Sequence, residues 1–196
     1  TRRSSDLMQL VRLMQDGEIV RMSKRTGKAI TLNDLLEDVS IDAARFFFNM
    51  RGAGSHLDFD LSLAKEQSND NPVFYVQYAH ARICGILSLL SEEGINVKPY
   101  AEIKPELLTD ETELDLLKKL SDLPEEIRIS AESLEPSKMT RYVMDLASAF
   151  HTFYNACRVN VEDEDLRDCR MKLIDCTRQV IAGVLNMLKI TAPEKM

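Results

Sequence analysis

Residues 71–90, NPVFYVQYAHARICGILSLL, carry the clearest secondary-structure signal in the sequence. This stretch begins with Asn71-Pro72, a typical helix start, because Asn caps the first turn and the first helical position needs no N–H. Apolar side chains then recur every three or four residues from Val76 to Leu90, and Gly94 follows as a stop signal. The pattern predicts one long helix with a single buried face.

The sequence after this stretch keeps the helical pattern. Pro105, Pro124 and Pro136 each precede a polar or acidic first turn and then apolar residues at helical spacing. Long helices are predicted over residues 136–159 and 166–188, and no strand pattern occurs after residue 70. We therefore predict that residues 72–196 form a bundle of about five helices with short, proline-bearing connections.

Strand signals occur only before this stretch. Residues 7–24 predict a β-hairpin around Asp16-Gly17, because Asp-Gly is the strongest short turn signal between two strands. Residues 55–63 alternate apolar and polar side chains, as a short strand with one buried face does. The N-terminal part of the chain is therefore predicted to contain a small sheet.

Two helices are predicted between these strands. The first covers residues 31–39 and begins with a capping pattern. The second begins near Ser40 or Asp42 and is expected to end at Gly52 or Gly54. The predicted fold class is therefore mainly α, with a small mixed α/β unit followed by an α-helical bundle.

The charge of the chain is unevenly distributed. The 196 residues carry a net charge of −7, but residues 1–30 alone carry +4, which leaves −11 for the rest. An acidic body argues against indiscriminate nucleic-acid binding, because neutralised phosphates supply most of that affinity. A specific nucleic-acid partner, held by a few cations and aromatic rings, stays compatible with this charge.

Cysteine usage and hydropathy indicate where the protein works. The four cysteines form no CxxC pair and have no His at ligand spacing, so we expect a reducing compartment and no metal site. The apolar runs are shorter than a membrane span, and no signal peptide is visible. We therefore expect a cytoplasmic protein that makes no contact with a membrane.

A compact basic segment, EIVRMSKRTGK at residues 18–28, stands out from its acidic host. It is not a P-loop, because Met22 and Ala29 occupy positions that need Gly and Ser or Thr. The segment is either a solvated cationic turn or a phosphate site. Its hydroxyl side chains and Gly27 suit a triphosphate better than charge alone would.

Two Tyr–Arg pairs lie at i,i+4 spacing in the predicted bundle, Tyr78 with Arg82 and Tyr154 with Arg158. Such pairs can stack on an unpaired base and hydrogen-bond to it, although half-buried packing is the commoner role of a tyrosine on a helix. His80 is interpreted as a packed structural histidine. The acidic run at residues 162–168 is interpreted as a solvated helix start, because it lacks the glycine and the final glutamate of a calcium loop.

Three stretches, RMSKRTGKAITLNDLLEDVSIDAARFFF, SHLDFDLSLAKEQSNDNPVFYVQYAHARI and TRQVIAGVLNMLKITAPEKM, closely resemble the C-terminal part of bacterial arginyl-tRNA synthetases. The resemblance covers essentially the whole chain. It implies a class I enzyme that activates arginine with ATP and transfers it to tRNA(Arg). The parent enzyme would use Mg with its ATP substrate, hold no tightly bound cofactor and act as a monomer.

The resemblance also implies roles for single residues. The KMSKS-like motif falls on residues 21–25, so Arg21, Met22, Ser23 and Lys24 would contact ATP. Lys24 and Ser23 would act in catalysis, because a fixed ammonium and a hydroxyl can stabilise charge that builds on the phosphates. The resemblance places tRNA contacts on Tyr154, on the helix that carries Arg82 and on the terminal Met196. Together with the two Tyr–Arg pairs, the expected tRNA-binding residues are Tyr78, Arg82, Tyr154, Arg158 and Met196.

The resemblance further implies three parts of the chain. These are the end of a class I catalytic core at residues 1–28, a stem-contact region at 29–71 and an anticodon-binding domain at 72–196. A HIGH-type motif does not occur in these residues, so we expect no aminoacylation by the chain alone. Two alternatives stay open: the same portion of another class I synthetase, and a non-catalytic helical interaction module.

Overall fold

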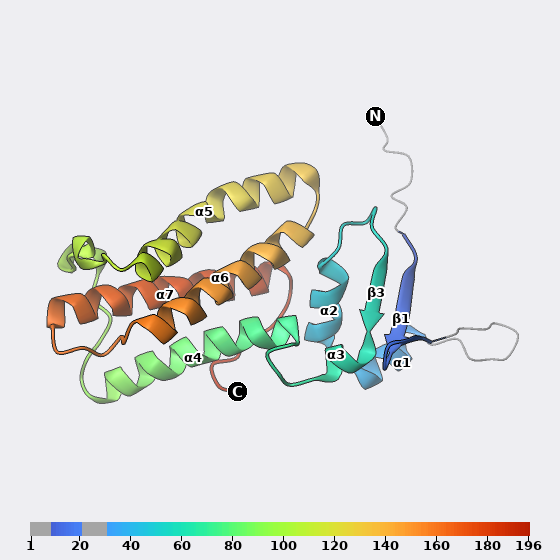
Figure 1. Cartoon of the computed structure of the whole chain (residues 1–196), viewed down its shortest axis with the longest axis horizontal. Helices are drawn as coiled ribbons and strands as arrows, with labels where there is room; N and C mark the ends of the chain where they lie inside the picture. The colour runs from blue at the N-terminus through green and yellow to red at the C-terminus, as the bar shows by residue number, and fades with distance from the viewer. Residues whose placement is uncertain (1–8, 21–30) are drawn as a thin grey trace, which may run out of the picture.

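The chain folds into a helical bundle with a small α/β unit packed at one end (Figure 1). The computed structural model describes residues 9–20 and 31–196. The bundle contains four long helices, and the α/β unit contains a three-stranded sheet and three short helices. This arrangement confirms the predicted fold class.

The sheet joins residues that lie far apart in the sequence. Its strands are β1 (Val11–Gln15), β2 (Glu18–Ile19) and β3 (Leu57–Asp60), in the order β2-β1-β3. β1 and β2 form the predicted hairpin, and Asp16 and Gly17 both have positive φ, 51° and 80°, as a tight hairpin turn requires. β1 also pairs in parallel with β3, so the first two predicted parts of the chain share one sheet.

Three short helices complete the α/β unit: α1 (Leu32–Asp38), α2 (Ile41–Asn49) and α3 (Leu61–Lys65). The predicted ends of two elements are wrong. α2 ends at Asn49, before either glycine, and its last turn closes on Met50. The strand predicted to reach residue 63 ends at Asp60, because the Asp60 carboxylate accepts a hydrogen bond from the Leu63 amide and caps α3.

The bundle holds one α-helix fewer than predicted. Its helices are α4 (Pro72–Glu92), α5 (Glu111–Ser133), α6 (Ser137–Ala156) and α7 (Glu164–Met187), and the 3₁₀ turns η1 (Tyr100–Glu102) and η2 (Pro105–Leu107) join α4 to α5. Pro124 does not start a helix but lies inside α5. A proline removes one backbone hydrogen bond, and α5 continues because Leu116 before it is fully buried and Leu120 and Ile127 also pack on the core.

α4 begins as predicted, with the Asn71 side chain capping it and Pro72 in its first turn. By length and composition alone α4 could cross a membrane, which is also true of many core helices in folded domains. Val76, Ala79 and Ile83 are nevertheless fully buried, and α4 packs against α2, α6 and α7. This burial is that of a core helix in a folded domain.

Candidate nucleic-acid interface

The predicted ATP-binding residues Arg21, Met22, Ser23 and Lys24 lie outside the residues that the structure describes. The four cysteines are all described and are free. Among the described residues, no three His, Cys, Asp or Glu side chains group as metal ligands would.

Most of the predicted tRNA-binding residues meet in one hollow of about 490 Å³ between α4, α6 and the C-terminal segment. We call it the Tyr154 pocket. It combines aromatic rings, a guanidinium and aliphatic side chains, which is the composition that an unpaired base needs for stacking and hydrogen bonding. Its lining residues are Tyr78, Ala81, Arg82, Gly85, Ile86, Leu89, Tyr154, Glu194, Lys195 and Met196.

A hydrogen-bonded cation–π pair connects the two helices of this pocket. The Arg82 Nη2 donates to the Tyr154 hydroxyl at 2.8 Å, and the Arg82 guanidinium carbon lies 4.9 Å from the centre of the Tyr154 ring. The hydrogen bond to Tyr154 raises the pKa of Arg82, whose guanidinium is charged at any physiological pH. Arg82 is exposed and Tyr154 is half-buried, so both can still meet a ligand.

Neighbouring aromatic side chains pack against the two tyrosine rings of the pocket. Tyr78 lies between Phe74, at 6.4 Å with nearly parallel rings, and His151, at 6.0 Å. Tyr154 stacks on the fully buried Phe150 at 5.9 Å. Burial lowers the pKa of His151, which therefore packs as a neutral ring, in keeping with its position beside the core. The cluster fixes both tyrosines before any ligand binds.

Met196 reaches the pocket because the chain reverses after α7. Lys189 has a φ of 58°, and the segment that follows runs back beside α4, where the C-terminus lies (Figure 1). Met196 lines the Tyr154 pocket and is 54% exposed. The structure thus brings Tyr78, Arg82, Tyr154 and Met196 together from three separate parts of the chain.

Arg158 is not part of this pocket. α6 ends at Ala156 and Cys157 has extended backbone, so the predicted i,i+4 pairing of Arg158 with Tyr154 is wrong. Arg158 is exposed, and its carbonyl accepts a hydrogen bond of 2.7 Å from Arg170. A ligand would have to extend beyond the pocket to meet the Arg158 side chain.

Sequence reasoning missed several residues of the pocket. Gly85 lies three residues after Arg82 on α4, and a Cβ added there would meet nothing within 4 Å, so the absent side chain leaves the hollow open. A glycine at helical spacing from the Tyr–Arg pair was the available signal. Glu194 gave no signal, because only the folded chain brings the C-terminal segment to α4.

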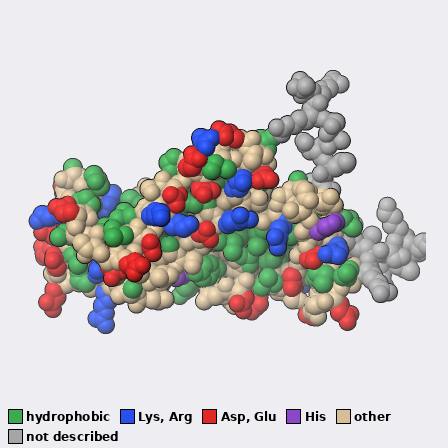
Figure 2. Space-filling model, turned by 45° about the horizontal axis from the view of Figure 1, so that its top comes forward, with side chains coloured by type: hydrophobic (Ala, Val, Ile, Leu, Met, Phe, Trp, Pro, Cys, Tyr) green, Lys and Arg blue, Asp and Glu red, His purple; other side chains and the backbone are tan. Residues whose placement is uncertain are grey.

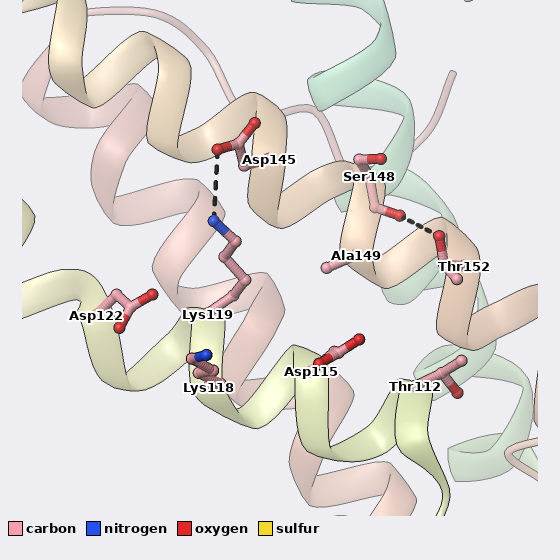
Figure 3. Close-up of a pocket in the computed structure, with 9 residues that line it drawn as sticks. All are labelled: Thr112, Asp115, Lys118, Lys119, Asp122, Asp145, Ser148, Ala149 and Thr152. Carbon is pink, nitrogen blue, oxygen red and sulfur yellow. Dashed lines mark hydrogen bonds and ion pairs between the residues drawn. The ribbon is translucent and has the colours of Figure 1, made fainter.

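A second hollow, of about 580 Å³, lies between α5 and α6 (Figure 3). We call it the α5–α6 groove. Lys119 of α5 and Asp145 of α6 point toward each other across it at 3.4 Å, and no aromatic ring lines it. Its lining residues are Thr112, Asp115, Lys118, Lys119, Asp122, Asp145, Ser148, Ala149 and Thr152.

Basic side chains do not form a uniform patch on the face drawn in Figure 2, where Lys and Arg lie among Asp and Glu. A surface of this kind gives little sequence-independent attraction to nucleic acid. Any nucleic-acid binding on this face must therefore depend on specific contacts.

The chain resembles known proteins along nearly its whole length. Residues 76–196 match the DALR anticodon binding domain family. The chain is 62% identical over 190 residues to the arginine–tRNA ligase of Ruminiclostridium cellulolyticum and 61% identical to that of Acetivibrio thermocellus. These matches include 97% of this chain but 34% of each relative, so the chain spans about a third of their length.

Solved structures agree with this assignment. An arginyl-tRNA synthetase structure from Campylobacter jejuni superposes with a TM-score of 0.84 at 27% identity, over 97% of this chain and 40% of that one. The Thermus thermophilus arginyl-tRNA synthetase shares the fold, with a TM-score of 0.74 at 24% identity over 94% of this chain and 34% of that one. The chain therefore belongs to the DALR anticodon binding domain family and resembles the C-terminal portion of arginine–tRNA ligases.

Proposed function

We propose that this chain is the tRNA-binding portion of an arginine–tRNA ligase and that the Tyr154 pocket holds an unpaired anticodon base of tRNA(Arg). One observation carries the proposal: Arg82 is fixed against Tyr154 at 2.8 Å while both side chains stay accessible in an open hollow. A base can stack on such a tyrosine and accept hydrogen bonds from such a guanidinium. Tyr78 and Met196 border the same space.

The parent enzyme would activate arginine with ATP, in the presence of Mg, and transfer it to tRNA(Arg). Lys24 and Ser23, with Arg21 and Met22, would supply one side of the ATP site. Their role rests on the resemblance of residues 21–25 to a KMSKS motif. The parent would be a cytoplasmic monomer. We also propose that the chain divides after residues 28 and 71 into the end of a catalytic core, a stem-contact region and an anticodon-binding domain.

Filter binding tests the tRNA assignment. Transcripts of tRNA(Arg), the same transcripts with substituted anticodon bases, and transcripts of other tRNAs are compared at one fixed, moderate salt concentration, because salt sets the nonspecific background. We expect anticodon substitution to weaken binding by about 10- to 150-fold, because another base still stacks on the tyrosine but loses its hydrogen bonds to the charged Arg82.

The result also separates the alternatives. Tightest binding to a transcript for another amino acid would favour a different class I synthetase. Equal binding to all transcripts would contradict the anticodon proposal and favour a helical interaction module.

A further inference from the structure

The C-terminal segment after α7 is held by side chains that do not line the Tyr154 pocket. We call residues 189–196 the C-terminal tail. The Arg45 guanidinium donates to the Lys189 carbonyl at 2.6 Å. The Asp42 carboxylate accepts hydrogen bonds from both the amide and the hydroxyl of Thr191. The start of the tail is thus fixed to α2.

α4 holds the tail at two further points. The Gln77 side-chain amide donates to the Thr191 carbonyl at 2.9 Å and to the Asp42 carboxylate at 3.1 Å. The His80 Nδ1 lies 2.9 Å from the Pro193 carbonyl and must be the donor, since a carbonyl can only accept. His80 is 3% exposed, so this hydrogen bond is protected from water.

Side chains on α4 have two different roles. Gln77 and His80 hold the tail, whereas Tyr78 and Arg82 line the pocket that Met196 borders. A free chain terminus is usually disordered, and ordering it on binding would cost conformational entropy. Hydrogen bonds that order the tail in the free protein remove this entropy cost and keep Met196 beside the Tyr154 pocket.

We propose that Asp42, Gln77 and His80 are positioning residues, which hold the C-terminal tail so that Met196 covers the base bound in the Tyr154 pocket. The inference rests on the proposed function, because it assigns the tail to the same binding site. It predicts that these polar side chains affect tRNA binding through the tail and without touching the nucleic acid.

Hydrogen–deuterium exchange tests the first half of the proposal in the free protein. Two variants are used: Gln77→Leu removes the amide donor without adding charge, and Gln77→Glu places a carboxylate against the Thr191 carbonyl and Asp42. We expect the Thr191 amide to exchange at least about tenfold faster in both variants, because Gln77 then no longer holds the Thr191 carbonyl or Asp42, the carboxylate to which this amide donates. Exchange in α4, α6 and α7 should be unchanged.

Transcript binding tests the second half. Each Gln77 variant is made in the full chain and in a chain that ends at Ile190, which lacks the rest of the tail. We expect about 2- to 10-fold weaker binding of the tRNA(Arg) transcript in the full chain, the size of one lost net hydrogen bond. In the shortened chain the same substitutions should have no effect, because there is no tail to position.

The outcomes separate this inference from the proposed function. Unchanged exchange at Thr191, faster exchange throughout α4, or an equal loss of binding in both chain lengths would overturn the positioning role. If neither Tyr154→Ala nor the shortening alters transcript binding, the proposed function fails and the role of the tail in binding fails with it. In that case the exchange experiment still shows whether Gln77 holds the tail.

Discussion

The Tyr154 pocket and the α5–α6 groove lie against the same helix and have similar volumes, about 490 and 580 Å³. Their chemistry differs. The pocket presents two tyrosines, an arginine and a terminal methionine, whereas three aspartates, two lysines and short polar side chains line the groove. Volume alone would rank the groove higher as a binding site, and the side chains reverse that order.

The two sides of α6 also differ in what they hold together. Toward α5, the buried Tyr142 donates its hydroxyl proton to the Lys119 carbonyl at 2.9 Å, and burial raises the pKa of Tyr142. Toward α4, Tyr154 makes its hydrogen bond with the exposed Arg82. The α5 side uses its polar groups to stabilise the fold, and the α4 side keeps them accessible to a ligand.

The largest expected effect concerns the buried ion pair at the start of α5. Glu113, 1% exposed, accepts a hydrogen bond of 2.6 Å from Arg170 and one of 2.9 Å from the Asp110 amide. Glu113→Ala leaves the largely buried Arg170 without its carboxylate and should lower the free energy of unfolding by about 3–5 kcal/mol. Urea unfolding measures this loss. Transcript affinity per folded molecule should stay unchanged.

An exposed ion pair on the same helix is the matched control. Glu132 contacts Arg128 at 2.7 Å near the end of α5, and both side chains are more than half exposed. Glu132→Ala should change the unfolding free energy by less than about 1 kcal/mol. Equal losses of unfolding free energy in the two variants would contradict the distinction between the buried and exposed pairs. Weaker transcript binding by folded Glu113→Ala would contradict the purely structural role of the α5 side of α6.

The second prediction concerns transcript affinity rather than the free energy of unfolding. Tyr154→Ala removes the stacking face and the partner of Arg82, so transcript affinity should fall by about 1–3 kcal/mol, the usual value of one base–aromatic contact. The half-buried ring also packs on Phe150, so circular dichroism and urea unfolding must show that the variant is folded. Filter binding at fixed salt measures the affinity.

Tyr154→Phe is the matched control for this prediction, because it keeps the ring and removes the hydroxyl that accepts from Arg82. It should lose about 0.5–1.5 kcal/mol of binding, the net value of a hydrogen bond. An unchanged affinity of the folded Tyr154→Ala variant would place the base elsewhere.

Much of the fold could be predicted from local signals. Asp16-Gly17 fixed the hairpin, and Asn71-Pro72 fixed the start of α4, because a turn type and a helix cap depend on a few adjacent residues. Pro124 misled the prediction, because packing on both sides of it outweighs one lost hydrogen bond. The parallel pairing of β1 with β3 had no local signal, because residues far apart in the sequence form it.

The candidate site could be predicted in part. The resemblance indicated Arg82, Tyr154 and Met196, and helical spacing added Tyr78. The same spacing wrongly paired Tyr154 with Arg158, which lies beyond the end of α6. The hydrogen bond between Arg82 and Tyr154 joins two helices and could not be inferred from spacing along either one. The same limit hid Gln77 and His80, whose partners lie more than a hundred residues away.

The smallest expected effect is in the α5–α6 groove, where Asp145 pairs with Lys119 at 3.4 Å and both side chains are substantially exposed. Asp145→Asn removes the charge and keeps the shape, so the unfolding free energy should change by less than about 1 kcal/mol. If the groove only joins α5 to α6, transcript affinity should stay within about twofold, with a slight gain because one negative charge is removed from an acidic surface. A loss of affinity comparable to that of Tyr154→Ala would mean that the nucleic acid contacts both sides of α6. The distinction between a structural side and a binding side of α6 would then be wrong.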